Sequence, residues 1–268
     1  MTALLQSELF RIRRRAQSWI MIAISVGLVG LLYVGFLIAH LVKPDSINIL
    51  NNLRVDNIFN NGLIVPQIVA PILAVVFGAG LIGSEYSWNT LRPLVARSRS
   101  RFSLQMAKWV TLGIYTLALT VLTIVSTFVF AMLGGIFSGQ GAGVTGSTLI
   151  DIVAISARYS MALLPSAALA YALALIFRSN AVGIAGGIAI TMLEPIIFLL
   201  LGVISGTFKS LEKGGMAFNI TRLMSYGGSN DNSSATQVWT SAGILALWIV
   251  VLMVGTILLF RRRDITSG

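Results

Sequence analysis

The sequence predicts an all-α integral membrane protein, with six transmembrane helices in one domain of residues 1–268. Hydrophobic residues make up 56% of the chain and charged residues only 10%, whereas soluble domains average roughly 25% charged residues. The charges stand between long uncharged runs, and about 20 helical residues cross the roughly 30 Å hydrocarbon core of a bilayer. By this length we expect spans at about residues 18–42, 64–84, 109–133, 159–177, 181–205 and 239–260.

The chain begins with a stretch that has the periodicity of an amphipathic helix. From Leu5 to Trp19, apolar residues recur at i, i+4, i+7, i+11 and i+14. Such a helix can lie on the cytoplasmic leaflet, with its apolar stripe in the acyl boundary and its basic residues among anionic head groups. A basic flank that only fixes orientation is a compatible alternative. The rest of the helix surface carries Arg11, Arg13, Arg14 and Arg15.

Prolines and glycines predict interruptions in three of the spans. Pro66 and Pro71 fall in the first half of the second span and are expected to kink or break its start. The glycines that begin at Gly134 predict that the third helix ends near that residue. In the fifth span, Glu194 and Pro195 are expected to interrupt the helix.

The basic residues predict how the spans are oriented. Thirteen of the 19 lysines and arginines fall on the side that holds both termini, and six fall on the other side. The positive-inside rule therefore places the N- and C-termini in the cytoplasm. We expect a multi-pass protein of the cell membrane, inner or plasma, in a prokaryote.

Several classes of function are disfavoured by what the sequence lacks. The chain has no cysteine and one histidine, His40, so we expect no metal site. Without paired carboxylates, a histidine cluster or a Ser/His arrangement, we predict no catalytic residue and no enzyme activity. The net charge of +10 lies between the spans, so it is topological and nucleic acid is not an expected partner. No Gly-x-x-x-x-Gly-Lys-[Ser/Thr] phosphate loop occurs, so we expect this chain to bind no nucleotide cofactor.

The most informative stretch runs from Gly83 to Arg101, between the second and third spans. Four arginines within ten residues predict that it lies in water, at the inner ends of both spans. A short helix at this place could pass a push from a partner to both spans, whereas a stop-transfer loop would have only a topological role. The helix would offer an apolar ridge of Leu91, Leu94 and Val95 and a polar rim of Glu85, Arg92 and Arg97.

A family resemblance favours the first of these interpretations. Glu85 is followed by Thr90, Leu91 and Arg92, and then by Ser100, Arg101 and Lys108. This order resembles the first cytoplasmic loop of the ABC-2 type permeases, the membrane subunits of ATP-binding-cassette exporters. The closing run at residues 260–265 and the amphipathic N-terminus are also similar to that family. The chain departs from the pattern at Asn89, where a glycine is common, and at Ser98, where a proline is common.

The resemblance implies the permease subunit of an ATP-driven exporter and not an enzyme. It implies a cytoplasmic coupling helix seated on a separate ATPase subunit, and an N-terminal interface helix. It also implies two copies of that ATPase, which would hold ATP and Mg, and a second permease subunit in the lipid bilayer, with a homodimer expected before a heterodimer. The residues that we expect at the coupling contact are Glu85, Thr90, Leu91 and Arg92, which match the family's order, together with Leu94, Val95 and Arg97 of the ridge and rim.

Glu194 is a carboxylate that the sequence places inside the membrane. It follows Arg178 by 16 residues, about 24 Å of helix, which is the outer third of the hydrocarbon core. One hypothesis is that Glu194 and Pro195 line the outer gate of the substrate path. The alternative is that they only end the span early. The competing function is an ion-gradient-driven secondary transporter or channel, with Glu194 as its proton or cation site.

Three glycines nearby, at positions 183, 186 and 187, include the small-x-x-small spacing of closely packed helices. The spacing is compatible with packing inside the subunit or with a dimer seam.

Overall fold

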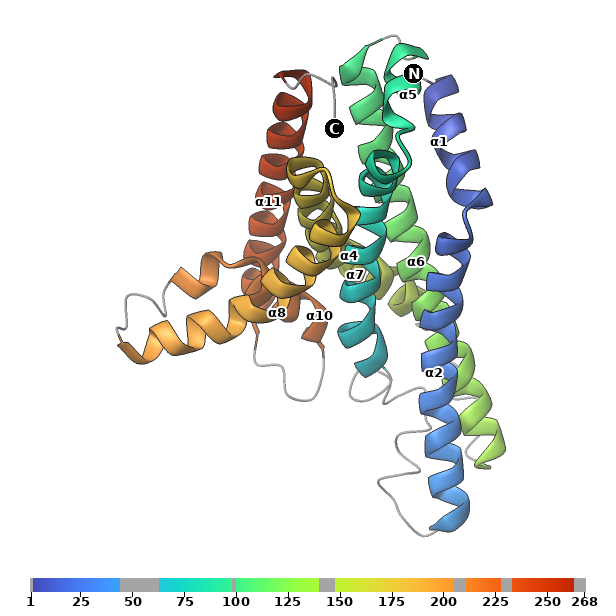
Figure 1. The fold of residues 1–268 in the computed structure, drawn as a ribbon. Helices are drawn as coiled ribbons and strands as arrows, with labels where there is room; N and C mark the ends of the chain where they lie inside the picture. Colours follow the sequence, from blue (N-terminus) through green and yellow to red (C-terminus); the bar gives the residue numbers. More distant parts are fainter. Residues whose placement is uncertain are drawn as a thin grey trace.

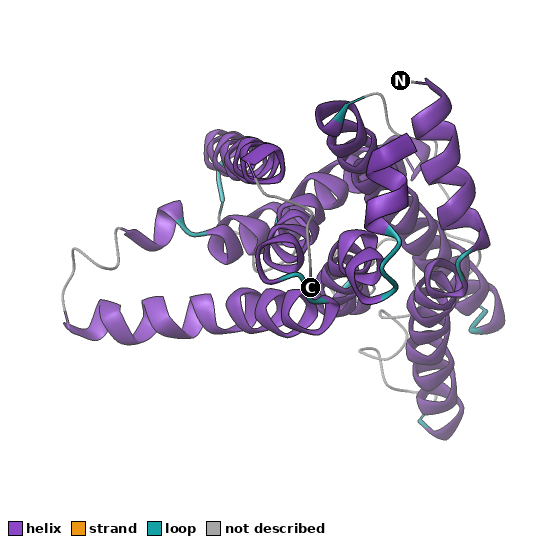
Figure 2. Ribbon diagram, turned by 45° about the horizontal axis from the view of Figure 1, so that its top comes forward, coloured by secondary structure: helices purple, strands orange, loops and turns teal. Residues whose placement is uncertain are grey.

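The computed structural model describes residues 2–43, 63–97, 100–139, 148–204, 211–227 and 233–262. These ranges contain helices and no strand, so the prediction of an all-α protein is confirmed (Figure 2). Six helices are long and apolar enough to cross a membrane, namely α2, α4, α6, α7, α8 and α11. The elements are α1 (Thr2–Arg14), α2 (Ala16–Val42), α4 (Ile64–Ser87), α5 (Leu91–Arg97), α6 (Arg101–Phe137), α7 (Thr148–Phe177), α8 (Asn180–Ile204), η3 (Glu212–Gly214), α10 (Met216–Ser225) and α11 (Ala235–Arg262).

The bundle is built around the pair α4 and α7, which make the most extensive helix contact in the described part of the chain. Their close approach is possible because Gly78 of α4 lies against the backbone of Ala167 of α7. α8 packs against both of these helices, while α2 and α6 pack together beside them. The start of α1, α5 and the carboxyl end of α11 all lie at one end of the bundle (Figure 1).

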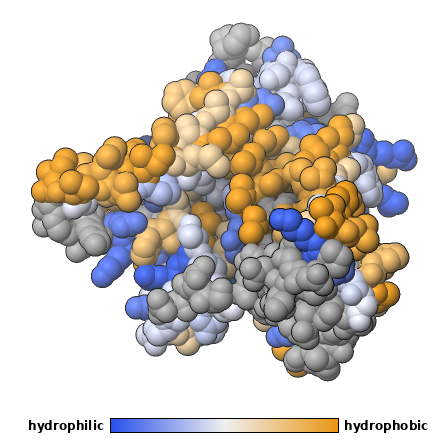
Figure 3. All heavy atoms as spheres, turned by 90° about the horizontal axis from the view of Figure 1, so that it is seen from below, coloured by the Kyte–Doolittle hydropathy of each residue, from blue (hydrophilic) through white to orange (hydrophobic). Residues whose placement is uncertain are grey.

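The outer surface of the bundle is apolar. Side chains such as Leu31, Leu41 and Val203 are 69%, 72% and 84% exposed, and Figure 3 shows hydrophobic side chains gathered over the outside of the helices. A soluble protein rarely exposes apolar surface of this extent, whereas lipid chains cover it at no cost. The structure is therefore that of a multi-pass membrane protein.

The prediction that proline breaks α4 or interrupts α8 was wrong. α4 is continuous through Pro71, and Pro66 lies in the first turn, where backbone N–H groups have no intrahelical acceptor to lose. α8 continues through Pro195 to Ile204, so Glu194 and Pro195 neither interrupt nor end it. A membrane helix tolerates proline where neighbouring helices and side chains compensate for the lost hydrogen bond.

Three helix boundaries also differ from the predicted ones. α6 begins at Arg101, where the Ser100 hydroxyl accepts a hydrogen bond from the Ser103 amide as an N-cap. It then passes through Gly134 to Phe137, because Gly134 and its neighbour are buried by packing, which offsets the low helix propensity of glycine. The N-terminal amphipathic stretch is likewise not one helix, since α1 ends at Arg14 and Arg15 has extended backbone angles.

Candidate functional site

Four charged side chains meet where α1, α4 and α6 pack together. The Glu85 carboxylate of α4 accepts a hydrogen bond from Lys108 Nζ of α6 and another from Arg11 Nη1 of α1, each at 2.5 Å. Glu8 of α1 lies beside them, with Oε1 3.4 Å from Arg11 and 3.6 Å from Lys108. We call Glu8, Arg11, Glu85 and Lys108 the charge cluster. Two carboxylates face two cations, so its formal charge is zero.

The charge cluster is largely shielded from solvent. Glu8 and Glu85 are each 1% exposed and Lys108 is 0% exposed, while the Arg11 side chain keeps 31% exposure. Lys108 also donates to the carbonyl oxygen of Leu81 at 3.5 Å. Because a buried charge is costly when it loses its partner, the charge cluster holds α1 against α4 and α6.

The arginines before the first span divide into two groups. Arg11 belongs to the charge cluster, and Arg15 lies 5.6 Å from the Trp88 ring and donates to the Gly80 carbonyl at 3.3 Å. Burial lowers the pKa of Arg15, and the negative charge of Glu85 opposes that shift. The expectation that all four arginines face lipid head groups was therefore wrong for Arg11 and Arg15, because α4 offers them acceptors. The arginines exposed on this segment are Arg13 and Arg14.

A sharp turn joins α4 to α5. Asn89 has a φ of 52°, in the left-handed region that glycine and asparagine tolerate best. Asparagine can adopt this conformation, which explains why it can replace the glycine that is common at this position in the ABC-2 type permeases. The Thr90 amide then donates to the Glu85 carbonyl at 3.0 Å, and the Thr90 carbonyl accepts from Leu94 at 3.3 Å. The turn therefore places α5 directly after the helix end that carries Glu85.

α5 is anchored by the predicted apolar ridge. Leu91 is 3% exposed, and Leu94 and Val95 are half-buried against the core. Thr90, just before the helix, and Ala96, near its end, are exposed. The predicted rim residues Arg92 and Arg97 lie on α5, but their side chains lie outside the described residues.

The position predicted for Glu85 was wrong. We expected its carboxylate on the polar rim of the coupling helix, in contact with water. Instead Glu85 lies inside α4, two residues before its end at Ser87, and its carboxylate points to Lys108 and Arg11. The reason is that two cations reach it from other helices, which makes burial of the carboxylate tolerable.

Sequence reasoning overlooked Glu8. It is the first acidic residue of the chain, and the next is Asp45. Glu8 stands three residues after Leu5 and four before Ile12, so it shares the apolar stripe of α1. A lone carboxylate on an apolar stripe is a signal that a buried cation lies opposite.

Glu194 of α8 accepts a hydrogen bond from the N-terminus of α10. Its Oε2 accepts a hydrogen bond from the amide of Ala217, the second residue of α10, at 3.1 Å. The N-cap residue of α10 is Gly215, which has no side chain to accept this bond. A carboxylate at a helix N-terminus satisfies orphan N–H groups and complements the helix dipole. Glu194 therefore fastens α10 to α8.

Replacing Glu194 with alanine is expected to lower stability by about 1 kcal/mol, the usual loss for a helix N-cap. Hydrogen exchange at the amide of Ala217 should become faster, because this group loses its acceptor. Glu194→Gln keeps an acceptor oxygen and should have a smaller effect. Glu212→Gln, a change of a nearby carboxylate in η3, is the control. Equal exchange in Glu194→Ala and the unaltered protein would contradict the capping role.

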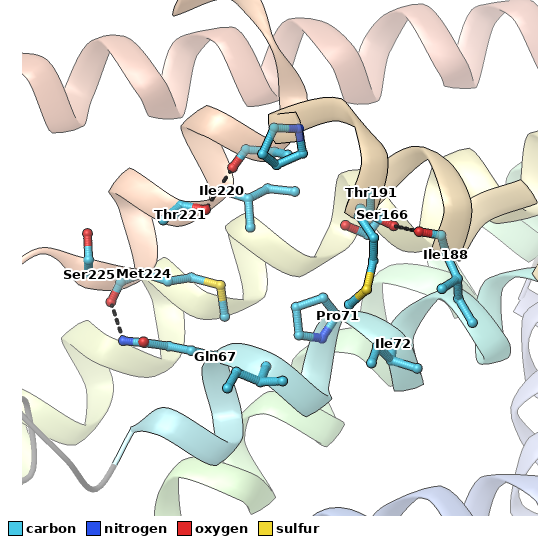
Figure 4. Close-up of a pocket in the computed structure, with 14 residues that line it drawn as sticks. Gln67, Pro71, Ile72, Ser166, Ile188, Thr191, Ile220, Thr221, Met224 and Ser225 are labelled. Carbon is cyan, nitrogen blue, oxygen red and sulfur yellow. Dashed lines mark hydrogen bonds between the residues drawn. The ribbon is translucent and has the colours of Figure 1, made fainter. Parts of the chain in front are cut away.

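Two cavities flank α8 at this level. Glu194 lies on the wall of an apolar cavity of about 760 Å³, which Trp248 of α11 also lines. Pro195 lines a second cavity of about 390 Å³ between α4, α7, α8 and α10, which we call the four-helix pocket (Figure 4). The two residues predicted for the substrate path therefore face different cavities.

The glycines of α8 pack inside the subunit. A Cβ on Gly183 would stand 2.6 Å from the Ala174 Cβ, and one on Gly187 would stand 2.7 Å from Val75. A Cβ on Gly186 would meet Leu173 at 3.0 Å. These contacts are with α4 and α7, so the small residues explain close packing within one chain.

No group of three or more His, Asp or Glu residues that could hold a metal ion occurs among the described residues. The charge cluster contains two carboxylates, but each faces a cation of the chain itself.

Comparison with known proteins identifies similar sequences without an assigned activity. Residues 34–266 match a family described as "Protein of unknown function (DUF2705)". The chain is also similar to the uncharacterized protein YhcI of Bacillus subtilis (strain 168), with 30% identity over 74 residues. That match spans 28% of this chain and 23% of YhcI, less than a quarter of the relative's length.

Proposed function

Given that this chain belongs to the DUF2705 family of proteins of unknown function, we propose that it is the permease subunit of an ATP-driven ABC exporter. In this proposal two such subunits, most simply two copies of this chain, form the substrate path. Two copies of a separate ATPase subunit supply the energy through α5. The observation that carries the proposal is the position of α5 directly beside the buried charge cluster.

This arrangement is suited to transmitting force. α5 follows Glu85 by a tight turn, and Glu85 is bonded to α1 and α6 through Arg11 and Lys108. A displacement of α5 would therefore move the ends of α4, α6 and α1 together. Interfaces and packed cores transmit such displacements because they cannot deform freely.

The charge distribution supports a cytoplasmic position for α5. The exposed arginines Arg261 and Arg262 close α11, whose carboxyl end lies at the same end of the bundle as α5, and the exposed Arg13 and Arg14 close α1, which starts at that end (Figure 1). Under the positive-inside rule this end faces the cytoplasm, where a soluble ATPase would reach it.

The direct test is purification of the tagged chain from its own membranes. We expect a soluble protein with a phosphate loop to co-purify, and ATP hydrolysis to occur only in the complex. Transport by the reconstituted single polypeptide under a proton gradient alone would instead support the competing secondary transporter. The secondary transporter would use Glu194 as its proton or cation site, and the structure disfavours this role because the carboxylate already caps α10.

The chain contains no cysteine, so a single introduced thiol reports one position. We expect a membrane-impermeant maleimide to label Ala96→Cys on α5 only after cells are permeabilised. Lys43 is an exposed position at the carboxyl end of α2, away from α1. The reagent should label Lys43→Cys in intact cells. Addition of the ATPase subunit should protect Ala96→Cys and leave Lys43→Cys reactive. Labelling of Ala96→Cys in intact cells would rule out the coupling role.

A further inference from the structure

The four-helix pocket lies between the central helices α4 and α7 and the helices α8 and α10. In Figure 4, Ile220 and Met224 of α10 face Gln67 and Pro71 of α4 across it, and Thr191 and Ser166 lie at its other side. Its volume of about 390 Å³ falls in the lower range of small-molecule sites. The wall is formed by Gln67, Ile68, Pro71, Ile72, Ser166, Ile188, Thr191, Met192, Pro195, Ala217, Ile220, Thr221, Met224 and Ser225.

None of these fourteen described residues carries a charge. The charged groups around α10 are engaged elsewhere: Arg222 stacks on the Phe218 ring at 4.5 Å, and Arg158 donates to the Tyr226 carbonyl at 2.8 Å. The Glu194 carboxylate accepts a hydrogen bond from the amide of Ala217 and lines the neighbouring apolar cavity. A charged ligand would therefore lose its hydration in the pocket without gaining an ion pair, which is costly. The pocket is suited to an uncharged ligand.

The polar groups of the wall are mainly acceptors. Thr191 and Thr221 donate their hydroxyl hydrogens to carbonyls of their own helices, those of Gly187 and Ala217. Their oxygen lone pairs remain available on the pocket wall. Ser166 differs, because its hydroxyl is 0% exposed and has no hydrogen-bond partner in the structure. A buried hydroxyl without a partner is unusual and indicates a bond that a ligand or water completes.

Two prolines add to the supply of acceptors. Pro71 of α4 and Pro195 of α8 both line the four-helix pocket, and proline has no N–H to donate to the carbonyl four residues earlier. The residues four positions earlier are Gln67 and Thr191, which line the same pocket. In membrane proteins, backbone carbonyls freed in this way are tolerated where they line a cavity.

From these observations we propose that the four-helix pocket binds an uncharged ligand with an apolar body and at least one hydrogen-bond-donating group, such as a hydroxyl. Ile68, Ile72 and Ile220 contact the body, and Ser166 accepts from or donates to the polar group. That this ligand is a transported substrate rests on the proposed function, whereas binding itself does not require the ATPase.

Three anthracene derivatives with the same ring system test the proposal. 9-Anthracenemethanol is neutral and carries a hydroxyl, 9-anthracenecarboxylate is an anion, and 9-(aminomethyl)anthracene is a cation at pH 7. Equilibrium dialysis against the purified full chain in detergent, with empty micelles as the reference, gives the saturable binding of each. We expect saturable binding of the alcohol and at least tenfold weaker binding of both charged analogues.

Variants locate the binding. Ser166→Ala should weaken binding of the alcohol about three- to tenfold, as expected for one net hydrogen bond. Ser156 of α7 is also a buried serine without a hydrogen-bond partner, but it lies outside the pocket. Ser156→Ala should therefore have no effect on binding of the alcohol. Thr221→Phe, at an exposed position of the wall, should fill the pocket and abolish saturable binding.

Equal binding of the charged analogues, or equal effects of Ser166→Ala and Ser156→Ala, would overturn the proposal. So would saturable binding that persists in Thr221→Phe. Saturable binding without any ATPase co-purification would remove only the proposed exporter function, whereas co-purification without saturable binding would remove only this inference.

Discussion

Replacing Lys108 with methionine is expected to lower the free energy of unfolding by about 3–5 kcal/mol, the usual loss when one partner of a buried ion pair is removed. Lys108 is 0% exposed and bonds Glu85 at 2.5 Å. Without it, Glu8 and Glu85 would face each other with Arg11 as the remaining cation of the charge cluster. Thermal unfolding of the purified protein in detergent would measure the loss.

A double-mutant cycle makes this prediction specific to the charge pair. Glu85→Gln alone should also destabilise, because it leaves Lys108 with the more distant Glu8 at 3.6 Å. The double variant Lys108→Met, Glu85→Gln should lose less stability than the sum of the two single variants. Both charges of the pair are removed together, so neither is left buried without its partner.

Arg13→Met is the matched control for Lys108→Met. Arg13 is an exposed arginine of α1, the helix that also provides Glu8 and Arg11. Its replacement should change stability by no more than about 0.5 kcal/mol. A Lys108→Met protein as stable as Arg13→Met would show that the charge cluster does not hold α1 in place.

The helices could be predicted from the sequence because the lengths of the uncharged runs are set by the thickness of the bilayer. The ridge of α5 was also predictable, since Leu91, Leu94 and Val95 repeat with helical spacing. The prolines were misjudged because their effect depends on neighbouring helices. Pro71 of α4 and Pro195 of α8 both line the four-helix pocket, where the two helices are neighbours. There the backbone hydrogen bond that each proline removes does not break its helix.

The charge cluster could not be predicted from local patterns. Arg11 and Glu85 are 74 residues apart in the chain, and Lys108 is 23 residues from Glu85. Periodicity assigns each of them to a helix face but does not indicate which faces meet. Each residue was therefore interpreted by its nearest neighbours, as a solvated rim or a basic flank. Tertiary packing converts these apparent surface charges into one buried group.

The contact of α4 with α7 gives the second large effect that we expect. A Cβ on Gly78 would lie 2.7 Å from the carbonyl carbon and 2.9 Å from the Cα of Ala167, and closer still to the Ala167 carbonyl oxygen. Backbone atoms cannot move aside as a flexible side chain can. Gly78→Ala should therefore force α4 and α7 apart and cost about 3 kcal/mol, the upper end of the losses from overpacking.

Gly113→Ala on α6 separates this steric effect from the intrinsic preference of the helix. A Cβ at Gly113 would have no neighbour within 4 Å, so this change should raise stability by up to about 1 kcal/mol through helix propensity. Gly78→Ala gains the same propensity, and any net loss must come from the contact with Ala167. Thermal unfolding of the two variants should therefore shift in opposite directions. A shift to higher temperature in both would mean that α4 and α7 are not packed as closely as Gly78 requires.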